Sequence, residues 1–207
     1  KVALGHNRYA TSYSQDKSNV NMIQPFSSSN LKLGYFTLVH NGNINNLEKV
    51  RQYFKLDKES DKLLNDSQLL VRIIEESPDY DMDNTLIRMV RNINGIFNLL
   101  VYHENTDSIY ALKDKFGNRP LCIGRNRRGV CVTSESVGLG DYEYIREIKS
   151  GEIVRIDNSG METIYIEKHR NQVCLFEFEL SEYPFGFDFD FETHEPVAKV
   201  FDNMDHS

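Results

Sequence analysis

The sequence of 207 residues lacks any apolar run that approaches the ~18 residues of a membrane-spanning helix. It also lacks a secretory signal, because the opening KVALGHNRYA contains no apolar core of sufficient length. There is no basic excess either, since 24 lysines and arginines stand against 31 aspartates and glutamates, for a net charge of -7. A nucleic-acid-binding surface needs a basic patch, so we expect neither a membrane nor a nucleic acid as partner.

Cysteine is scarce, and the three in the sequence are Cys122, Cys131 and Cys174. Their odd number and wide spacing match no zinc pattern, so we expect no metal site and a reducing, cytoplasmic location. The simplest interpretation of all three is a buried, apolar thiol.

An initiator methionine is also missing. Lys1 to Leu4 resembles the end of a strand that runs into a polar loop, so we expect the chain to be a piece of a longer one. Its length favours a single domain over two.

Hydrophobic periodicity predicts helices first and strands later. Leu33 to Val39 is a strand that is apolar on both faces and stops at His40-Asn41-Gly42-Asn43. Apolar residues at helical spacing then predict three helices, over 45–54, from Asn65 to before Pro78, and through Leu86 to Ile93. Short strands follow over 96–102, 109–113, 120–124, 130–133, 152–156 and 163–166. This order predicts an α+β domain with mainly antiparallel sheets.

The last part of the sequence has a different pattern. Cys174 to Leu180 alternates cleanly and is predicted to be a strand. Between Phe185 and Phe191, phenylalanines alternate with mainly acidic residues, which indicates either an amphipathic edge strand or a docking segment for a partner. After Thr193 the sequence is polar, and we expect no regular structure there.

Three polar clusters follow apolar elements, and each has a structural and a functional interpretation. Arg8 either makes a surface ion pair or clamps a carboxylate through two parallel hydrogen bonds. Asn41 and Gly42 form either a plain turn or an oxyanion hole made of a side-chain amide and a backbone N–H. Asp66 is either a helix N-cap or the site of an ammonium group. Together the functional interpretations describe a site that holds an α-amino acid while its side-chain amide is attacked, but no cysteine, serine or threonine pairs recognisably with a base.

A fourth polar cluster carries no catalytic argument of its own. It comprises the segment Asp114 to Pro120, followed by TSES at 133–136. Its residues suggest only a turn with an internal pair between Asp114 and Arg119.

The segments that carry these clusters resemble the glutaminase domain of class II glutamine amidotransferases, the N-terminal-nucleophile hydrolase type. Within this class they are most similar to the amidophosphoribosyltransferases. The similarity lies in GHNRYAT (5–11), QPF (24–26), LVHNGNINN (38–46), NDSQLL (65–70), DKFGNRPLCIG (114–124), TSES (133–136), SGEIV (150–154) and CLFEF (174–178). Because so many segments occur in the family's order, the resemblance is specific.

The resemblance implies a four-layer αββα fold over residues 1–180, with its N-terminal strands missing, and a divergent acidic and aromatic tail over 181–207. It implies that Arg8 binds the α-carboxylate of glutamine and Asp66 its α-ammonium. Asn41 and Gly42 would form the oxyanion hole. The family's nucleophile is an N-terminal cysteine that uses its own α-amine as base. That cysteine is absent from this chain, which is therefore expected to be inactive alone.

The resemblance further implies that ammonia passes to a phosphoribosyltransferase domain, which forms phosphoribosylamine from phosphoribosyl pyrophosphate in purine synthesis. That domain is also absent, and Mg²⁺ is expected only there, so we expect no cofactor in this chain. Expected partners are glutamine, the missing domain and, as one option, further copies of the chain. Two alternatives stay open: a non-catalytic glutamine-binding or interaction module, and a glutaminase that serves another acceptor such as a sugar phosphate.

Overall fold

The computed structural model describes residues 1–7, 23–56, 64–168, 187–190 and 195–198. The chain divides into two compact units, Lys1–Gln172 and Val173–Ser207. The described helices and strands of the first unit are β1 (Phe26–Asn30), β2 (Gly34–Ile44), α1 (Leu47–Phe54), α2 (Asp66–Glu75), α3 (Met82–Asn92), β3 (Gly95–His103), η3 (Glu104–Thr106), β4 (Ser108–Lys113), β5 (Cys122–Asn126), β6 (Gly129–Thr133), η4 (Ser136–Leu139), β7 (Glu143–Glu147), β8 (Glu152–Asp157) and β9 (Gly160–Ile166). The second unit contains β10 (Phe187–Asp190) and β11 (Glu195–Ala198).

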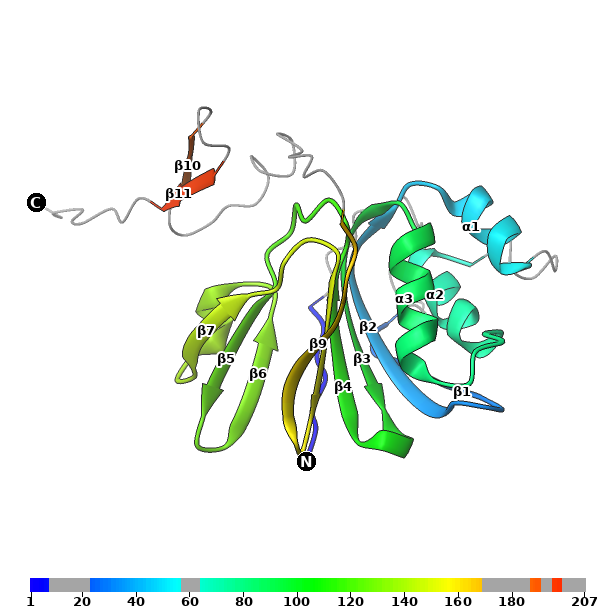
Figure 1. The fold of residues 1–207 in the computed structure, drawn as a ribbon, viewed down its shortest axis with the longest axis horizontal. Helices are drawn as coiled ribbons and strands as arrows, with labels where there is room; N and C mark the ends of the chain where they lie inside the picture. The colour runs from blue at the N-terminus through cyan, green and yellow to red at the C-terminus, as the bar shows by residue number, and fades with distance from the viewer. Residues whose placement is uncertain (8–22, 57–63, 169–186, 191–194, 199–207) are drawn as a thin grey trace, which may run out of the picture. The chain divides into compact units, whose positions relative to one another are not determined.

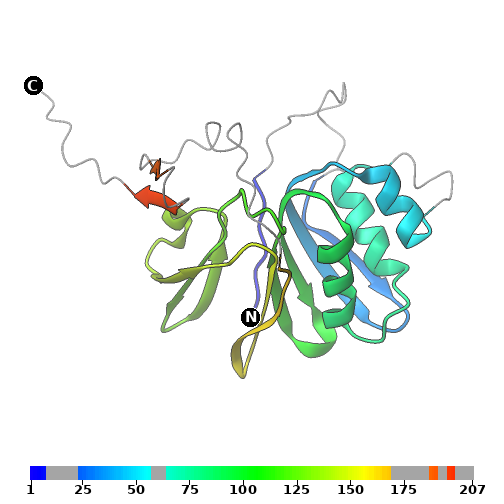
Figure 2. The same cartoon turned by 45° about the horizontal axis from the view of Figure 1, so that its top comes forward.

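A six-stranded sheet in the order β1-β2-β3-β4-β8-β9 forms the centre of the first unit, and all its pairings are antiparallel. Figure 1 shows α1, α2 and α3 on one face of this sheet and the smaller sheet β6-β5-β7 on the other face. The turned view in Figure 2 shows the same sequence of layers. The prediction of an α+β domain with mainly antiparallel sheets is therefore confirmed.

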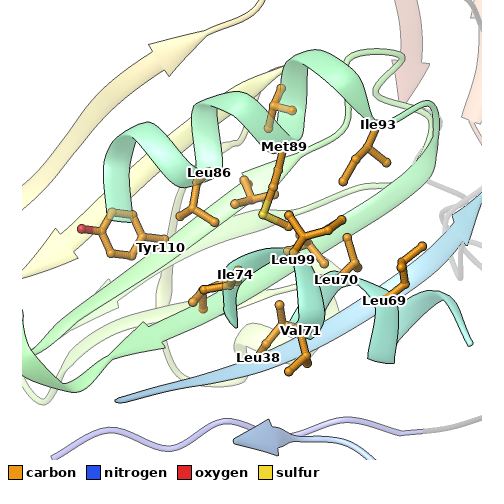
Figure 3. Close-up of a cluster of buried hydrophobic side chains, with 14 of the residues drawn as sticks. Leu38, Leu69, Leu70, Val71, Ile74, Leu86, Met89, Ile93, Leu99 and Tyr110 are labelled. Carbon is orange, nitrogen blue, oxygen red and sulfur yellow. The ribbon is translucent and has the colours of Figure 1, made fainter. Parts of the chain in front are cut away.

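The larger core lies between the helices and the central sheet. Figure 3 shows how α2 and α3 direct their apolar stripes towards β2, β3 and β4. Residues such as Leu69 and Leu86 are fully buried, and each such side chain contributes about 1.5–3 kcal/mol through removal from water. The labelled members of this core are Leu38, Leu69, Leu70, Val71, Ile74, Leu86, Met89, Ile93, Leu99 and Tyr110.

A second, smaller core lies between the two sheets. It is formed by Ala111, Leu121, Ile123, Ile148, Val154 and Ile156, with Leu100 packed against them. Leu99 and Leu100 are neighbours on β3 but belong to different cores, because successive residues of a strand point to opposite faces. The inner strands β3, β4 and β8 are thus covered on both sides, as the apolar character of their central residues predicts.

Helix α2 begins with a capping box. The side chain of Asn65 accepts a hydrogen bond from Gln68 N–H at 2.8 Å, and the side chain of Gln68 accepts one from Asn65 N–H at 3.1 Å. Both bonds satisfy backbone donors that a helix N-terminus leaves free. This corrects one of the interpretations of Asp66, because the N-cap is Asn65 and Asp66 is the first residue of the helix.

The prediction that the first strand stops at His40 was wrong. Strand β2 continues through Asn41 and Gly42 to Ile44, paired with β3 along its whole second half. Asn41-Gly42 is therefore neither a hairpin turn nor a plain turn. The polar sequence hid the continuation, because Asn and Gly are depleted in strands and typical of turns.

Two strands of the first unit were not predicted at all. β1 has the sequence FSSSN and β7 has EYIRE, and both lie at sheet edges. An edge strand with one exposed face needs little apolar alternation, so neither segment carries the expected signal. In β1 the polar residues pair across the strands, with Ser27 Oγ 2.9 Å from Thr37 Oγ1.

In the second unit, the described part of the alternating phenylalanine and acidic segment, Phe187–Asp190, is the strand β10. β10 pairs antiparallel with β11. The expectation that no regular structure follows Thr193 was wrong, since β11 begins at Glu195. The strand predicted over Cys174 to Leu180 lies outside the described residues.

Candidate functional site

The candidate site is built on the edge of β2 beyond the end of β1. β1 covers β2 only as far as the pair Phe26 and Leu38. In an antiparallel sheet, alternate residues direct both backbone polar groups to the same neighbouring strand. Beyond Leu38, the residues His40, Gly42 and Ile44 therefore direct their N–H groups to the edge that β1 no longer covers.

Side chains occupy two of these three positions. Gln24 binds His40 twice: its Oε1 accepts from His40 N–H at 2.5 Å and its Nε2 donates to His40 O at 2.9 Å. At the other end, Asp66 Oδ2 accepts from Ile44 N–H at 2.8 Å. Gly42 lies between them, so its N–H points to the same edge, between a carboxamide and a carboxylate.

The pairing of Phe97 confirms the direction of the Gly42 N–H. Phe97 is the residue of β3 that faces Gly42. Its N–H donates to Asp114 Oδ2 at 3.1 Å and its O accepts from Asp114 N–H at 3.0 Å. Because both polar backbone groups of Phe97 are directed away from β2, Gly42 and Phe97 form a non-hydrogen-bonded pair.

Gly42 is required here by close packing as well as by its conformation. Its φ is +151°, and a Cβ at this position would lie 2.1 Å from Ile96 O and 2.5 Å from Phe97 Cα. Both contacts are with backbone, which has no flexible end that can move away. The two strands therefore approach each other at a distance that only glycine permits.

Asn41 directs its side chain to the opposite face of the sheet from His40, where it meets Arg119. Arg119 Nη1 donates to Asn41 Oδ1 at 2.5 Å, although the residues are 78 positions apart in the chain. This contact occupies the amide oxygen and leaves the Nδ2 donors as the end of the side chain that can act on a ligand. The predicted pair between Asp114 and Arg119 does not occur among the described contacts. The Asp114 carboxylate accepts from backbone N–H groups, and Arg119 donates to Asn41.

A buried polar network lies beside these donors. His40 Nδ1 is 2.9 Å from Ser67 Oγ, and Gln24 Nε2 donates to the same hydroxyl at 3.3 Å. Ser67 Oγ thus links the side chains of Gln24 and His40. His40 is 3% exposed, and no described residue forms a hydrogen bond with its Nε2.

His40 is held neutral by its surroundings. Burial lowers the pKa of His40 from 6.5 to about 3, and the positive charge of Arg119 and the imidazole of His6 add to this effect. A neutral imidazole at this position can orient hydrogen bonds without adding charge to the site.

The Asp66 carboxylate has one oxygen that no described residue binds. Its Oδ2 is bound to Ile44 N–H, whereas no described residue donates to Oδ1. Asp66 is attached at Ile44, two residues after Gly42 on β2. Its carboxylate is therefore suited to bind the cationic group of a ligand whose acceptor atom is bound by Gly42 N–H. The structure thus brings together Asn41, Gly42 and Asp66, whereas Arg8 lies outside the described residues.

The described cysteines do not have the properties of nucleophiles. Cys122 is buried in the second sheet and Cys131 is partly buried there. Burial raises the pKa of both thiols, and the carboxylate of Glu147 raises that of Cys122 further. A reactive cysteine needs the opposite shift. Cys174 lies outside the described residues.

Several site residues were missed from the sequence, namely His40, Gln24, Ser67 and Arg119. Each is a polar residue inside a segment quoted above, but none has a local pattern that indicates chemistry. Their role becomes visible only when the sheet brings 24, 40, 67 and 119 together. Within the described ranges, no group of three His, Cys, Asp or Glu side chains is arranged to hold a metal ion. The described helices are all too short or too polar to span a membrane.

Comparison with known proteins identifies the family. The family profile described as "Glutamine amidotransferase domain" matches residues 6–141, a segment that contains Asn41, Gly42, Asp66 and Arg119. The chain belongs to the glutamine amidotransferase domain family. The family resemblance read from the sequence is thereby confirmed, and the class is that of the class II domains.

The glutamine amidotransferase domain is similar to several named proteins. It is 31% identical over 189 residues to "Amidophosphoribosyltransferase" of Archaeoglobus fulgidus, covering 86% of this chain and 39% of the relative. It is 33% identical over 183 residues to "Amidophosphoribosyltransferase 3, chloroplastic" of Arabidopsis thaliana, covering 85% of this chain and 33% of the relative. Among solved structures, the glutamine phosphoribosylpyrophosphate amidotransferase of B. subtilis, complexed with ADP and GMP, matches with a TM-score of 0.69 and 25% identity over 86% of this chain and 38% of its own. The chain thus spans less than half the length of these relatives.

Proposed function

We propose that this domain binds glutamine and releases its amide nitrogen as ammonia. Gly42 and Asp66 carry the proposal, because they place a backbone N–H donor and a carboxylate on one edge of β2, at neighbouring outward positions. The donor suits the γ-oxygen of glutamine and the carboxylate suits its α-ammonium. Asn41 would supply the second donor to the γ-oxygen, and Arg8 would bind the α-carboxylate.

The reaction we propose is acyl transfer. A cysteine thiolate from outside these 207 residues attacks the γ-carbonyl carbon, and the carbonyl electron pair moves to the oxygen. Asn41 Nδ2 and Gly42 N–H stabilise the resulting oxyanion. The oxyanion then collapses and the C–N bond breaks, while the base that took the thiol proton returns it to the nitrogen, which leaves as ammonia. Water hydrolyses the γ-glutamyl thioester to glutamate and regenerates the thiol.

We further propose that the domain belongs to an amidophosphoribosyltransferase-like enzyme with a four-layer αββα fold. The names of the similar proteins support phosphoribosyl pyrophosphate as the acceptor of ammonia, which gives phosphoribosylamine in purine synthesis. The acceptor site, with its Mg²⁺, would belong to a separate phosphoribosyltransferase domain. Pyrophosphate release by the natural protein, supplied with phosphoribosyl pyrophosphate and either glutamine or ammonia, tests this part. A sugar phosphate as the preferred acceptor would contradict it.

Binding of glutamine to the 207-residue chain tests the site directly. In isothermal titration, we expect L-glutamine to bind and D-glutamine to bind at least about tenfold more weakly, because the α-substituents of the D-isomer cannot meet Asp66 and Arg8 together. Asp66→Asn should weaken L-glutamine binding roughly 10- to 100-fold, as loss of a charge-assisted contact of about 1.5–3 kcal/mol implies.

Asp81→Asn is the matched control. Asp81 is the N-cap of α3, and its side chain accepts from Asn84 N–H at 2.7 Å. Asparagine caps helices as well as aspartate does, so this change should leave both stability and glutamine affinity unchanged. No binding of L-glutamine, or equal affinities of the Asp66→Asn and unchanged chains, would contradict the proposed site.

A further inference from the structure

The segment from Asp114 to Pro120, which has no evident chemistry of its own, is connected to the proposed oxyanion hole through Arg119. Arg119 Nη1 donates to Asn41 Oδ1 at 2.5 Å. A guanidinium has five donors and no acceptor, so only the oxygen end of the Asn41 amide can face it. The contact therefore fixes which way round the amide lies, with its oxygen towards Arg119 and its Nδ2 donors away from it.

The first end of this segment is anchored by Asp114, which is 1% exposed. Asp114 Oδ1 accepts from Phe116 N–H at 2.7 Å and from Gly117 N–H at 3.0 Å, which closes the loop on itself. Its Oδ2 accepts from Phe97 N–H at 3.1 Å. Since Phe97 faces Gly42 across the sheet, one carboxylate holds both the loop and the residue opposite the proposed backbone donor.

The other end of the segment is anchored on the same strand. Asn98 Nδ2 donates to Pro120 O at 2.7 Å. Asn98 is 3% exposed and faces Asn41 in the register of β2 and β3. The loop that carries Arg119 is thus attached to β3 at Phe97 and at Asn98. Phe97 faces Gly42 across the sheet, and Asn98 faces Asn41.

We propose that Arg119 is a positioning residue of the oxyanion hole and that the 114–120 loop holds it against β3 for this purpose. It acts through Asn41, by directing the Nδ2 donors of the amide to the developing oxyanion. This inference rests on the proposed function. Without the guanidinium, the planar amide of Asn41 is free to rotate and to present its oxygen, which repels an anion.

The first test follows the Asn41 side chain by NMR on the ¹⁵N-labelled 207-residue chain. Its NH₂ signal pair is identified as the pair that Asn41→Ala removes. We expect Arg119→Met to move this pair to the position of a free asparagine amide. Arg125→Met, which removes an exposed arginine from β5, is the matched control and should leave the pair in place. An unmoved Asn41 pair in Arg119→Met would overturn the proposal.

The second test compares two ligands. L-homocysteate has a tetrahedral sulfonate in the place of the γ-amide, so an anionic oxygen stands where the oxyanion would form. We expect Arg119→Met to weaken homocysteate about tenfold and to change the affinity for L-glutamine less than threefold, because the site stabilises the anion more than the neutral carbonyl. Equal weakening of the two ligands would overturn the proposal and assign Arg119 a general structural role.

A double-mutant comparison separates action through Asn41 from a direct effect of charge. If Arg119 acts through Asn41, adding Arg119→Met to Asn41→Ala should change homocysteate affinity less than twofold further. A full, additive second loss would overturn the proposal. If Arg119→Met does not fold, Arg119→Lys replaces it, since lysine keeps the charge but lacks the planar donor and should move the Asn41 signals in the same way.

The outcomes also separate the two proposals. If the unchanged chain binds neither ligand, the proposed function fails, and the Asn41 signals still decide whether Arg119 orients the amide. If both ligands bind but Arg119→Met affects neither the signals nor the ligand preference, the glutamine site stands and the role of Arg119 is refuted.

Discussion

His40 should make the folded protein sensitive to mild acid. Burial lowers the pKa of His40 from 6.5 to about 3, so the folded chain keeps the imidazole neutral where the unfolded chain protonates it. The unfolded state then binds more protons than the folded state between these pH values. The free energy of unfolding therefore falls as the pH falls from about 6.5 towards 3, and His40 adds no pH dependence above about 7.5.

The size of the effect follows from these two pKa values. When the pH is lowered from 7.5 to 5.5, the protonated fraction of His40 in the unfolded chain rises about tenfold. This lowers the free energy of unfolding by about 1.4 kcal/mol. The folded form contributes almost nothing in this interval, because its pKa lies more than two units below. Aspartates and glutamates with ordinary pKa values near 4 also change little there.

Urea denaturation at both pH values, with His40→Gln as the comparison, measures this contribution. Glutamine cannot be protonated, so the variant should lose about 1.4 kcal/mol less than the unchanged chain over the same interval. The substitution can lower stability at both pH values without affecting this difference. Equal losses in the two proteins would refute the description of His40 as a buried, neutral imidazole.

Three further predictions concern stability in urea at pH 7.5. Gly42→Ala should cost about 3 kcal/mol or more, because its Cβ would meet the backbone of β3. Gly160→Ala, at a similar φ of +140° but with open space around it, should cost only the strain of about 1–2 kcal/mol, and equal costs would refute the close approach. Arg146→Met removes both 2.8 Å hydrogen bonds to Glu152, which is 2% exposed, and should lower the free energy of unfolding by about 3–5 kcal/mol. A loss below about 1 kcal/mol would show that water reaches Glu152. Asn65→Ala should cost about 1 kcal/mol, and an unchanged midpoint would mean that the capping box contributes nothing.

The sequence predicted the elements that build the cores, because their signals are local. The apolar stripe of Leu69, Leu70, Ile73 and Ile74 is the buried face of α2. Strands with both faces covered are mainly apolar, and the 109–112 stretch of β4 is an example. The polar edge strands β1 and β7 could not be found this way, since their positions depend on pairing with β2 and β5 and not on their own composition.

The candidate site was predictable in part, and the limit has a physical cause. Asn41, Gly42 and Asp66 were identified through the family resemblance, and the structure places Gly42 N–H and the Asp66 carboxylate at one sheet edge, with Asn41 next to Gly42 in the chain. The contact between Arg119 and Asn41 joins residues 78 positions apart, and no periodicity or spacing encodes it. The interpretation of Asn41-Gly42 as a turn failed for a related reason. Local propensity favours a turn for this dipeptide, whereas pairing with β3 holds it extended.

The alternation of backbone directions along β2 explains why the proposed donor is Gly42 and not a neighbouring residue. Asn41 and Asn43 direct their backbone N–H groups to β3, so neither can serve a ligand at the open edge. His40 and Ile44 face the edge, but their N–H groups are bound to Gln24 and Asp66. A register shift of one residue would turn the Gly42 N–H into the sheet and expose those of Asn41 and Asn43 instead. The close approach at Gly42 opposes such a shift, because a residue with a Cβ would have to occupy the place that only glycine fits. The same glycine thus opposes a change of register and carries the N–H that we propose as the donor.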